Sequence, residues 1–292
     1  MKKTIVEVMP EALVDWFMVD QILEKIRNIS KDCRVILDFW YVYDFHPKGV
    51  IMLLTICSSI TRLTNSKIVI INIHSTVFAY LEKINFLDHG LFDVDHESMI
   101  WDDNIESEFY ESIIKITLIK SSDEKSSFVL DVKKMLEIWF PEERYRALKA
   151  DTLSSLMELC GNSMEHSDQI QSNGSCYVIM QKRLISDQIE VSLITTDFGV
   201  GIKYHQEQKY GILYESDYKY INEALEGVSG RLDGTGGLGL QRIRNSIKEH
   251  LGELIIRSGK GTVSITNESK KEEGRFQTPG TQCAIILRKQ IN

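Results

Sequence analysis

Four side chains of the types that carry acid–base and metal-binding chemistry lie in the stretch LMELCGNSMEHS: Glu158, Asn162, Glu165 and His166. At about 100° of rotation per residue, a helix would place them within roughly 100° of one another. The opposite side would carry the packing residues Leu153, Leu156, Met157, Cys160 and Met164. One side of this helix can therefore pack while the other does chemistry. A plain solvent-exposed face is the alternative, and only other segments can decide between the two.

A second candidate site follows a predicted strand that ends at Asp197, in the stretch TTDFGVGI. Gly199 and Gly201 have no side chains and let a ligand approach the backbone closely. A carboxylate at a strand end can accept a hydrogen bond from an exocyclic amine such as that of adenine. The alternative for this stretch is a glycine-rich turn with a solvated aspartate.

A third candidate site is DGTGGLGLQRIRNSIKEHL, in which glycines lead directly into a predicted helix. The apolar stripe of that helix would consist of Leu240, Ile243, Ile247 and Leu251. Free backbone N–H groups at a helix N-terminus can hold a phosphate. The alternative is a linker that merely precedes a helix.

Two other nucleotide-binding motifs are excluded by their surroundings. Gly234, Gly236 and Gly239 satisfy GxGxxG, but the dinucleotide fingerprint needs a strand directly before the glycines and an acidic residue at the end of the next strand. Here a helix and loop precede the glycines, and the next strand ends in Arg257 and Ser258. The stretch SGKGT lacks both the glycine spacing and the hydroxyl residue of a P-loop.

The elements that must position these residues alternate between strands and helices. We expect a strand in residues 110–121, helix across 128–167 with a break at Pro141, and a hairpin formed by the strands in 175–183 and 189–199. A polar, tyrosine-rich segment over 203–233 precedes the glycine-rich helix. Two last strands follow around 253–257 and 282–287, separated by a solvated loop over 268–280.

In this order, the three motifs resemble the GHKL ATPases, the superfamily of gyrase, heat-shock chaperone, histidine kinase and mismatch-repair ATP-binding domains. The resemblance covers residues 109–292 and implies a Bergerat fold, a two-layer α/β sandwich with a mixed sheet. It also implies that the domain binds ATP and Mg²⁺.

The resemblance assigns roles residue by residue. ELCGNSMEH would be the N box, in which Asn162 coordinates Mg²⁺ and Glu158 orients or deprotonates the attacking group. Asp197 would bind the adenine amine, with Gly199 and Gly201 beneath the base and Thr281 beside the aspartate. The glycine-rich G2 box would wrap the phosphates with Gly234, Thr235, Gly236, Gly237, Leu238 and Gly239.

The resemblance defines the roles of some further positions near the motifs less closely. The segment over 203–233 would be the ATP lid, with Arg231 as a phosphate contact at its end. The G2 stretch carries one glycine more than the histidine-kinase form, which leaves the lid geometry open. His166 is similar to a residue of the anti-sigma kinase N box, but a histidine that is simply hydrogen-bonded on its helix is the alternative.

The first part of the chain is predicted to be a separate α/β domain over residues 1–95, joined by an acidic linker over 96–108. A helix is expected over 12–29, followed by strands in 33–40 and 67–73, each with a helix after it, which favours parallel pairing. Residues 34–91 resemble a STAS domain, the anti-sigma-factor antagonist fold. The helix after Asp44 lacks the serine or threonine usual in that family, so a docking role fits better than a phosphorylation switch.

The composition limits the partners. It is 43% hydrophobic and 26% charged with a formal net charge of -8, which is typical of a globular protein and disfavours nucleic acid and anionic membranes. Five scattered cysteines without CxxC spacing predict reduced, buried thiols and a cytoplasmic location. No apolar run is long enough to span a membrane, and the first residues do not form a signal peptide.

Three functional hypotheses follow. The first is a regulatory Mg-ATP-binding protein in a bacterial-type signalling pathway that hydrolyses ATP, and the second is a protein-serine kinase that acts on a separate protein partner. The third is a nucleotide-gated interaction module with little chemistry, in which a partner binds the ordered lid. A histidine kinase is disfavoured because a phosphoacceptor helical hairpin has no counterpart. The oligomeric state, including a homodimer, is left open.

Overall fold

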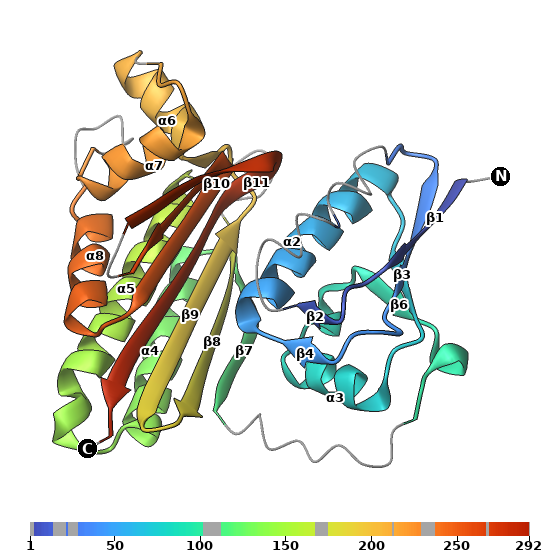
Figure 1. Cartoon of the computed structure of the whole chain (residues 1–292), viewed down its shortest axis with the longest axis horizontal. Coiled ribbons are helices and arrows are strands. Elements are labelled where there is room, and N and C mark those ends of the chain that lie inside the picture. Colours follow the sequence, from blue (N-terminus) through green and yellow to red (C-terminus); the bar gives the residue numbers. More distant parts are fainter. Residues whose placement is uncertain are drawn as a thin grey trace. The chain divides into compact units, whose positions relative to one another are not determined.

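The structure is a computed structural model, and it divides the chain into two compact units, Met1–Ile116 and Thr117–Asn292. It describes residues 3–13, 22, 29–101, 112–166, 175–211, 213–228, 237–266 and 269–291. Among the helices in these ranges, none is both long enough and apolar enough to cross a membrane. Figure 1 shows the elements of each unit.

The first unit is built around a parallel sheet, as the alternation of strands and helices predicted. Its strands are β1 (Lys3–Val8), β2 (Ala12–Leu13), β3 (Cys33–Asp38), β4 (Asp44–Phe45), β5 (Ile68–Ile71) and β6 (Phe92–Val94). Its described helices are α2 (Pro47–Thr64), α3 (Ser75–Lys83), η1 (Leu87–His89) and η2 (His96–Ser98). The main sheet has the order β1-β3-β5-β6 with parallel pairing throughout, and β2 pairs with β4.

Three features of the first unit differ from the sequence expectations. The strands β1 and β6 were missed, because β1 is an edge strand with exposed Val6 and Val8 and β6 is very short. Ala12–Leu13 forms a strand rather than the start of a helix, and most of the expected helix lies outside the described residues. Residues 96–101, expected in the linker, hydrogen-bond to this unit through the backbone N–H and C=O of Ile100.

The helix α2 begins at Pro47, where no hydroxyl side chain is present. The N-cap residue is His46, whose Nδ1 accepts a hydrogen bond from the Lys48 N–H at 3.1 Å. Pro47 is the first residue of the helix and has no backbone N–H. The first N–H groups of a helix have no acceptor within the helix, so proline loses no hydrogen bond here and favours a helix start. The STAS resemblance and the domain boundaries at 95 and 108 stay predictions.

The second unit has the predicted α/β class, with helices packed on a five-stranded sheet. The sheet order is β10-β11-β9-β8-β7, in which β10 and β11, β11 and β9, and β9 and β8 pair antiparallel. These strands are β7 (Ile113–Ile119), β8 (Cys176–Ile185), β9 (Gln188–Asp197), β10 (Glu253–Ile265) and β11 (Ser269–Gln290). The predicted hairpin is β8–β9, and Ser186 supplies the left-handed turn residue with φ 54°.

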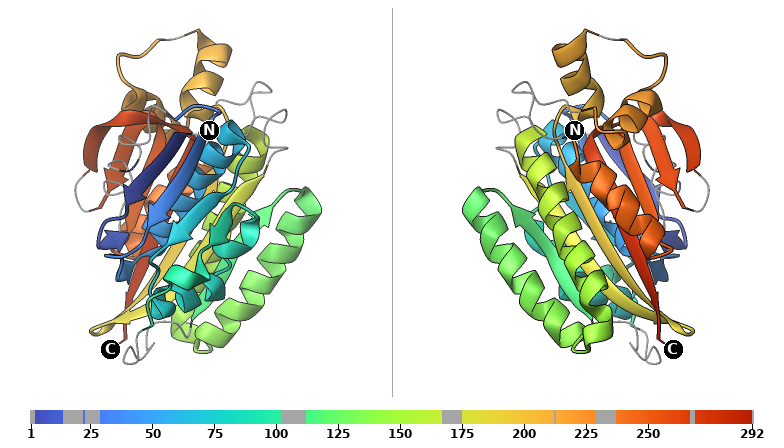
Figure 2. Two further views of the ribbon diagram at one scale, coloured as in Figure 1. Left: turned by 90° about the vertical axis from the view of Figure 1, so that its right-hand side faces the viewer. Right: turned by 90° about the vertical axis from the view of Figure 1, so that its left-hand side faces the viewer.

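The helices of the second unit form a layer and a separate pair. They are α4 (Ser122–Trp139), η3 (Glu143–Tyr145), α5 (Arg146–His166), α6 (Gly201–Tyr210), α7 (Asp217–Leu225) and α8 (Gly239–Glu249). Figure 2 shows α4, α5 and α8 side by side over one face of the sheet, with α5 between the other two. The pair α6 and α7 lies beyond the end of this layer and packs on β10.

The buried face of α5 differs in part from the predicted one. Leu156 and Cys160 are fully buried as expected, but Met157 is 53% exposed and Leu159 is buried in its place. The helix packs on the sheet and also against α4 on one side and α8 on the other, so three surfaces decide which of its residues are buried. Similarly, Leu251 was predicted in the apolar stripe of α8, but it follows the helix, is 67% exposed and has φ 47°.

Two further predictions concern the segment before the last strand and the state of the cysteines. The prediction of a solvated loop over 268–280 was wrong, because β11 begins at Ser269 and pairs with β10 from Ile265↔Ser269 onward. Two register shifts around Gly259 interrupt this ladder. All five cysteines are buried and free of disulfides, as predicted.

The packing of α5 predicts a contrast between adjacent residues. Leu156→Ala removes a fully buried side chain and should lower the free energy of unfolding of the second unit by about 2–5 kcal/mol. Met157→Ala, one residue along, should change it by no more than about 0.5 kcal/mol. Denaturant unfolding followed by circular dichroism measures both, and equal losses would contradict the packing described here.

Candidate functional site

The carboxylate of Asp197 lies at the end of β9 and is almost fully buried, with 4% exposure. Its Oδ1 accepts hydrogen bonds from the backbone N–H of Gly199 at 2.8 Å and of Thr281 at 3.0 Å. The Ser163 side chain on α5 also hydrogen-bonds to it. Residues from a helix, a turn and a second strand therefore converge on one buried acceptor.

Burial dominates the protonation of this carboxyl group. Loss of hydration raises the pKa of Asp197 from its ordinary 3.8 to about 6, although the hydrogen bonds from Gly199, Thr281 and Ser163 act in the opposite direction. The group is thus ionised at neutral pH while it lies in a poorly hydrated place. An ionised buried carboxylate favours contact with a further hydrogen-bond donor.

A pocket of about 800 Å³, partly open to solvent, brings together residues from all three candidate segments. Of the residues predicted from the sequence, those in its wall are Glu158, Asn162, Asp197, Gly237, Gly239 and Thr281. The sites that the sequence suggested separately therefore form the wall of a single cavity.

Other predicted site residues lie beside the pocket rather than in its wall. Gly199 supports Asp197 through its N–H, and Gly201 starts α6 with φ 81°. A Cβ at Gly201 would lie 2.7 Å from the Ser258 hydroxyl, so this close approach requires glycine. Leu238 is the N-cap residue of α8 and is 56% exposed.

Several sequence-predicted positions lie outside the part of the chain that the structure describes. These are Gly234, Thr235, Gly236 and Arg231 of the G2 box and the lid end. The backbone of His166 ends α5, but its side chain is outside the described part. Glu165 is exposed on α5 and is not among the residues of the pocket wall.

In the pocket wall, Glu158 lies against the N-terminus of α8. A Cβ on Gly239 would overlap the carboxyl group of Glu158, so only glycine allows this approach. Glu158 and Asn162, one helical turn apart on α5, are both half-buried. No side chain of the described residues caps α8 at Leu238, so the N–H groups of its first turn lie near the Glu158 carboxylate without such a cap.

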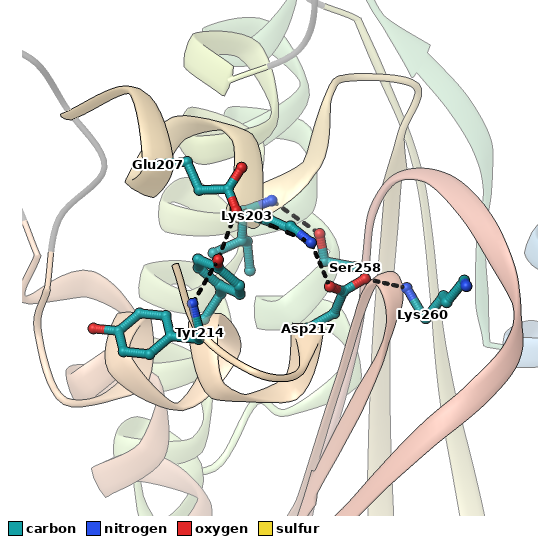
Figure 3. A network of polar contacts seen from close by, with 8 residues as sticks. Lys203, Glu207, Tyr214, Asp217, Ser258 and Lys260 are labelled. Carbon is teal, nitrogen blue, oxygen red and sulfur yellow. Dashed lines mark hydrogen bonds and ion pairs between the residues drawn. The ribbon is translucent and has the colours of Figure 1, made fainter. Parts of the chain in front are cut away.

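The helices α6 and α7 are attached to β10 by a polar network (Figure 3). The Asp217 carboxylate accepts from Lys203 Nζ at 3.2 Å and from the Lys260 N–H at 2.9 Å. The Ser258 hydroxyl accepts from the Ile202 N–H at 2.9 Å and lies 3.3 Å from Thr281 Oγ1. One serine therefore connects the start of α6 with the strand residue beside Asp197.

The same figure shows the junction between α6 and α7. The Tyr220 hydroxyl donates to Glu207 at 2.6 Å and accepts from the Tyr214 N–H at 2.9 Å. These helices also contribute His205, Gln206 and Ala224 to the pocket wall. These contacts join α6 to α7, the two helices that contribute this part of the wall.

Several pocket residues were missed by sequence reasoning. Thr195 and Cys283 lie two positions from Asp197 and Thr281 on their strands, and a period of two would have placed them on the same face. Ser163 directly follows Asn162 and could have been considered with it. Gln206 and Ser258 carry no local signal, because their contacts join segments far apart in the sequence.

Comparisons with known proteins add little. No protein-family model matches the sequence, and no similar protein is found among curated proteins. Among solved structures, the chain is similar to the catalytic domain of the histidine kinase ThkA in a nucleotide-free form, at 14% identity over 60% of this chain and 95% of that one. The TM-score of 0.25 is too low to support an assignment.

The fold and the site together define an α/β protein with one composite pocket in its second unit. The pocket wall combines the buried acceptor carboxylate of Asp197, the N-terminus of α8, and the half-buried carboxylate and amide of Glu158 and Asn162. These groups suit a ligand that has a hydrogen-bond donor at one end and negative charge at the other.

The raised pKa of Asp197 predicts a pH effect on stability. The folded state holds this proton more tightly than the unfolded state, so stability is lost as pH rises from about 4 to about 6. Relative to Asp197→Asn, which does not titrate, the wild type should lose on the order of 3 kcal/mol across this range. Denaturant titrations at pH 4, 5, 6 and 7 measure the difference, and parallel curves for the two proteins would contradict the assigned burial.

Proposed function

We propose that the second unit binds Mg-ATP as a GHKL-type domain, and that the protein hydrolyses ATP or transfers its phosphoryl group within a regulatory pathway. The observation that carries this proposal is the shared pocket wall of Glu158, Asn162, Asp197, Gly239 and Thr281. These residues come from α5, β9, α8 and β11, which are distant in sequence.

The inner part of the pocket fits an adenine base. The Asp197 carboxylate would accept a hydrogen bond from the exocyclic amine, and Thr281 would hold the aspartate in place through its N–H. Ile202 and Ile256 supply apolar surface to the same wall, as a planar base requires. Desolvation of Asp197 supports this fit, since a ligand donor would stabilise its ionised form.

The outer part of the pocket fits phosphates and a metal ion. Free N–H groups in the first turn of α8 would contact phosphate oxygens. The Asn162 oxygen would be a ligand of Mg²⁺, which usually shares its coordination between protein oxygens and substrate phosphates. Glu158 would orient or deprotonate the attacking water or hydroxyl group.

A second candidate function is nucleotide-gated binding of a protein partner. It is favoured by the contribution of α6 and α7 to the pocket wall through His205, Gln206 and Ala224. A bound nucleotide would contact these helices directly, and a partner could bind their outer surface. The first unit, in its proposed STAS-like role, would then serve as a dock. Assays of phosphoryl transfer to candidate partners, as opposed to binding alone, separate the two functions.

Nucleotide binding is tested through the aspartate. Wild-type protein should bind ATP with Mg²⁺ saturably, and Asp197→Asn should weaken binding by about 1–3 kcal/mol because it places a donor opposite the adenine amine. Isothermal titration calorimetry at pH 7.5 measures both proteins. Wild-type protein that does not bind ATP, or a variant that binds it equally well, would contradict the proposal.

Turnover is tested through the two glutamates of α5. Glu158→Ala should slow ATP turnover by about 10²- to 10⁴-fold while leaving ATP affinity nearly unchanged. Glu165→Ala is the matched control, since Glu165 is an exposed residue of the same helix outside the pocket wall. Phosphate release measures the rates, and equal turnover in wild type and Glu158→Ala would remove Glu158 from the chemistry.

A further inference from the structure

We propose that Gln206 is a specificity-determining residue of the pocket, whose side-chain oxygen accepts a hydrogen bond from a ribose hydroxyl of the nucleotide. This inference rests on the proposed nucleotide function and deepens it. It specifies that the site takes ribonucleotides in preference to deoxyribonucleotides.

The first argument concerns the direction in which the Gln206 amide points. Gln206 lies on α6 in the pocket wall and is only 2% exposed. Its Nε2 donates to the backbone oxygen of Tyr220 on α7 at 3.0 Å. A carbonyl oxygen can only accept, so the amide nitrogen must face Tyr220 and the amide cannot be flipped. The side-chain oxygen is therefore the acceptor that Gln206 can offer to a ligand.

The second argument concerns the unmet bonding capacity of that oxygen. Oε1 of Gln206 is buried and has no hydrogen-bond partner among the described residues. Buried acceptors in folded proteins are almost always paired, and an unpaired one carries the cost of lost hydration. An unpaired acceptor in the wall of a ligand pocket would be satisfied when a ligand places a donor there.

The third argument selects the donor. At neutral pH the donors of ATP are the exocyclic amine and the ribose hydroxyls, and the amine is assigned to Asp197. Helix α6 begins at Gly201, where an added Cβ would lie 3.4 Å from the backbone oxygen of Gly280, and Gly280 in turn approaches Asp197 closely. With a rise of about 1.5 Å per residue, the backbone of Gln206 lies roughly 7 Å further along this helix. A donor at that distance from the amine fits the sugar rather than the base.

The test compares three nucleotides. Dissociation constants of Mg-ATP, Mg-2′-deoxy-ATP and Mg-3′-deoxy-ATP are measured for wild type and for Gln206→Leu, which keeps the bulk but lacks the acceptor. In wild type, at least one deoxynucleotide should bind about 5- to 30-fold more weakly than ATP. In Gln206→Leu this ratio should fall to about one, because the hydroxyl no longer finds its acceptor.

The matched control is Tyr220→Phe. It removes the hydroxyl contacts with Glu207 and Tyr214 at the same helix junction but leaves the backbone oxygen that orients Gln206. This variant should keep the wild-type ratio, which separates loss of the acceptor from general loosening of the two helices. Gln206→Met replaces Gln206→Leu if the latter does not fold.

Each contrary outcome has a distinct meaning. Equal wild-type affinity for all three nucleotides overturns the role of Gln206 while leaving ATP binding intact. A deoxynucleotide penalty that persists in the Gln206 variants overturns the assignment to this residue. Absence of ATP binding to wild type overturns the proposed function, and this inference with it.

Discussion

The buried carboxylate of Asp197 is the constraint on which the rest of the pocket depends. A charge with 4% exposure is costly, and its burial raises the pKa to about 6. The cost is partly offset by N–H groups of Gly199 and Thr281 and by Ser163, so β11, α5 and the turn after β9 must keep their places relative to one another. The arrangement that makes the unit sensitive to pH also leaves an acceptor suited to a ligand amine.

The polar network around Ser258 extends this constraint to the helices that face the ligand. Ser258 contacts both Thr281, next to the carboxylate, and Ile202 at the start of α6. Asp217 holds α7 to β10 and pairs with Lys203 of α6. Displacement of either helix would therefore disturb the residues around Asp197, so the ligand that we propose for this pocket would be coupled to the positions of α6 and α7.

Regular elements could be predicted from local patterns, whereas contacts between distant segments could not. The helix predicted after the strand in 33–40 is α2, and β9 ends at Asp197 as expected from its β-rich sequence. The start of α4 was placed six residues late, at 128 rather than Ser122, although the Ser121 side chain accepts from the Glu124 N–H as a helix cap. Met157 was assigned to the wrong face because its burial depends on three neighbouring surfaces. The role of Gln206 depends on Tyr220, and no local pattern connects them.

The central claim is that adenine lies against Asp197 with its phosphates at the N-terminus of α8. A crystal structure of the protein with Mg²⁺ and a non-hydrolysable ATP analogue tests it most directly. The account predicts the exocyclic amine within hydrogen-bond distance of the Asp197 carboxylate and phosphate oxygens near the N–H groups after Leu238. An analogue bound outside this pocket, or one whose base lies away from Asp197, would contradict the account.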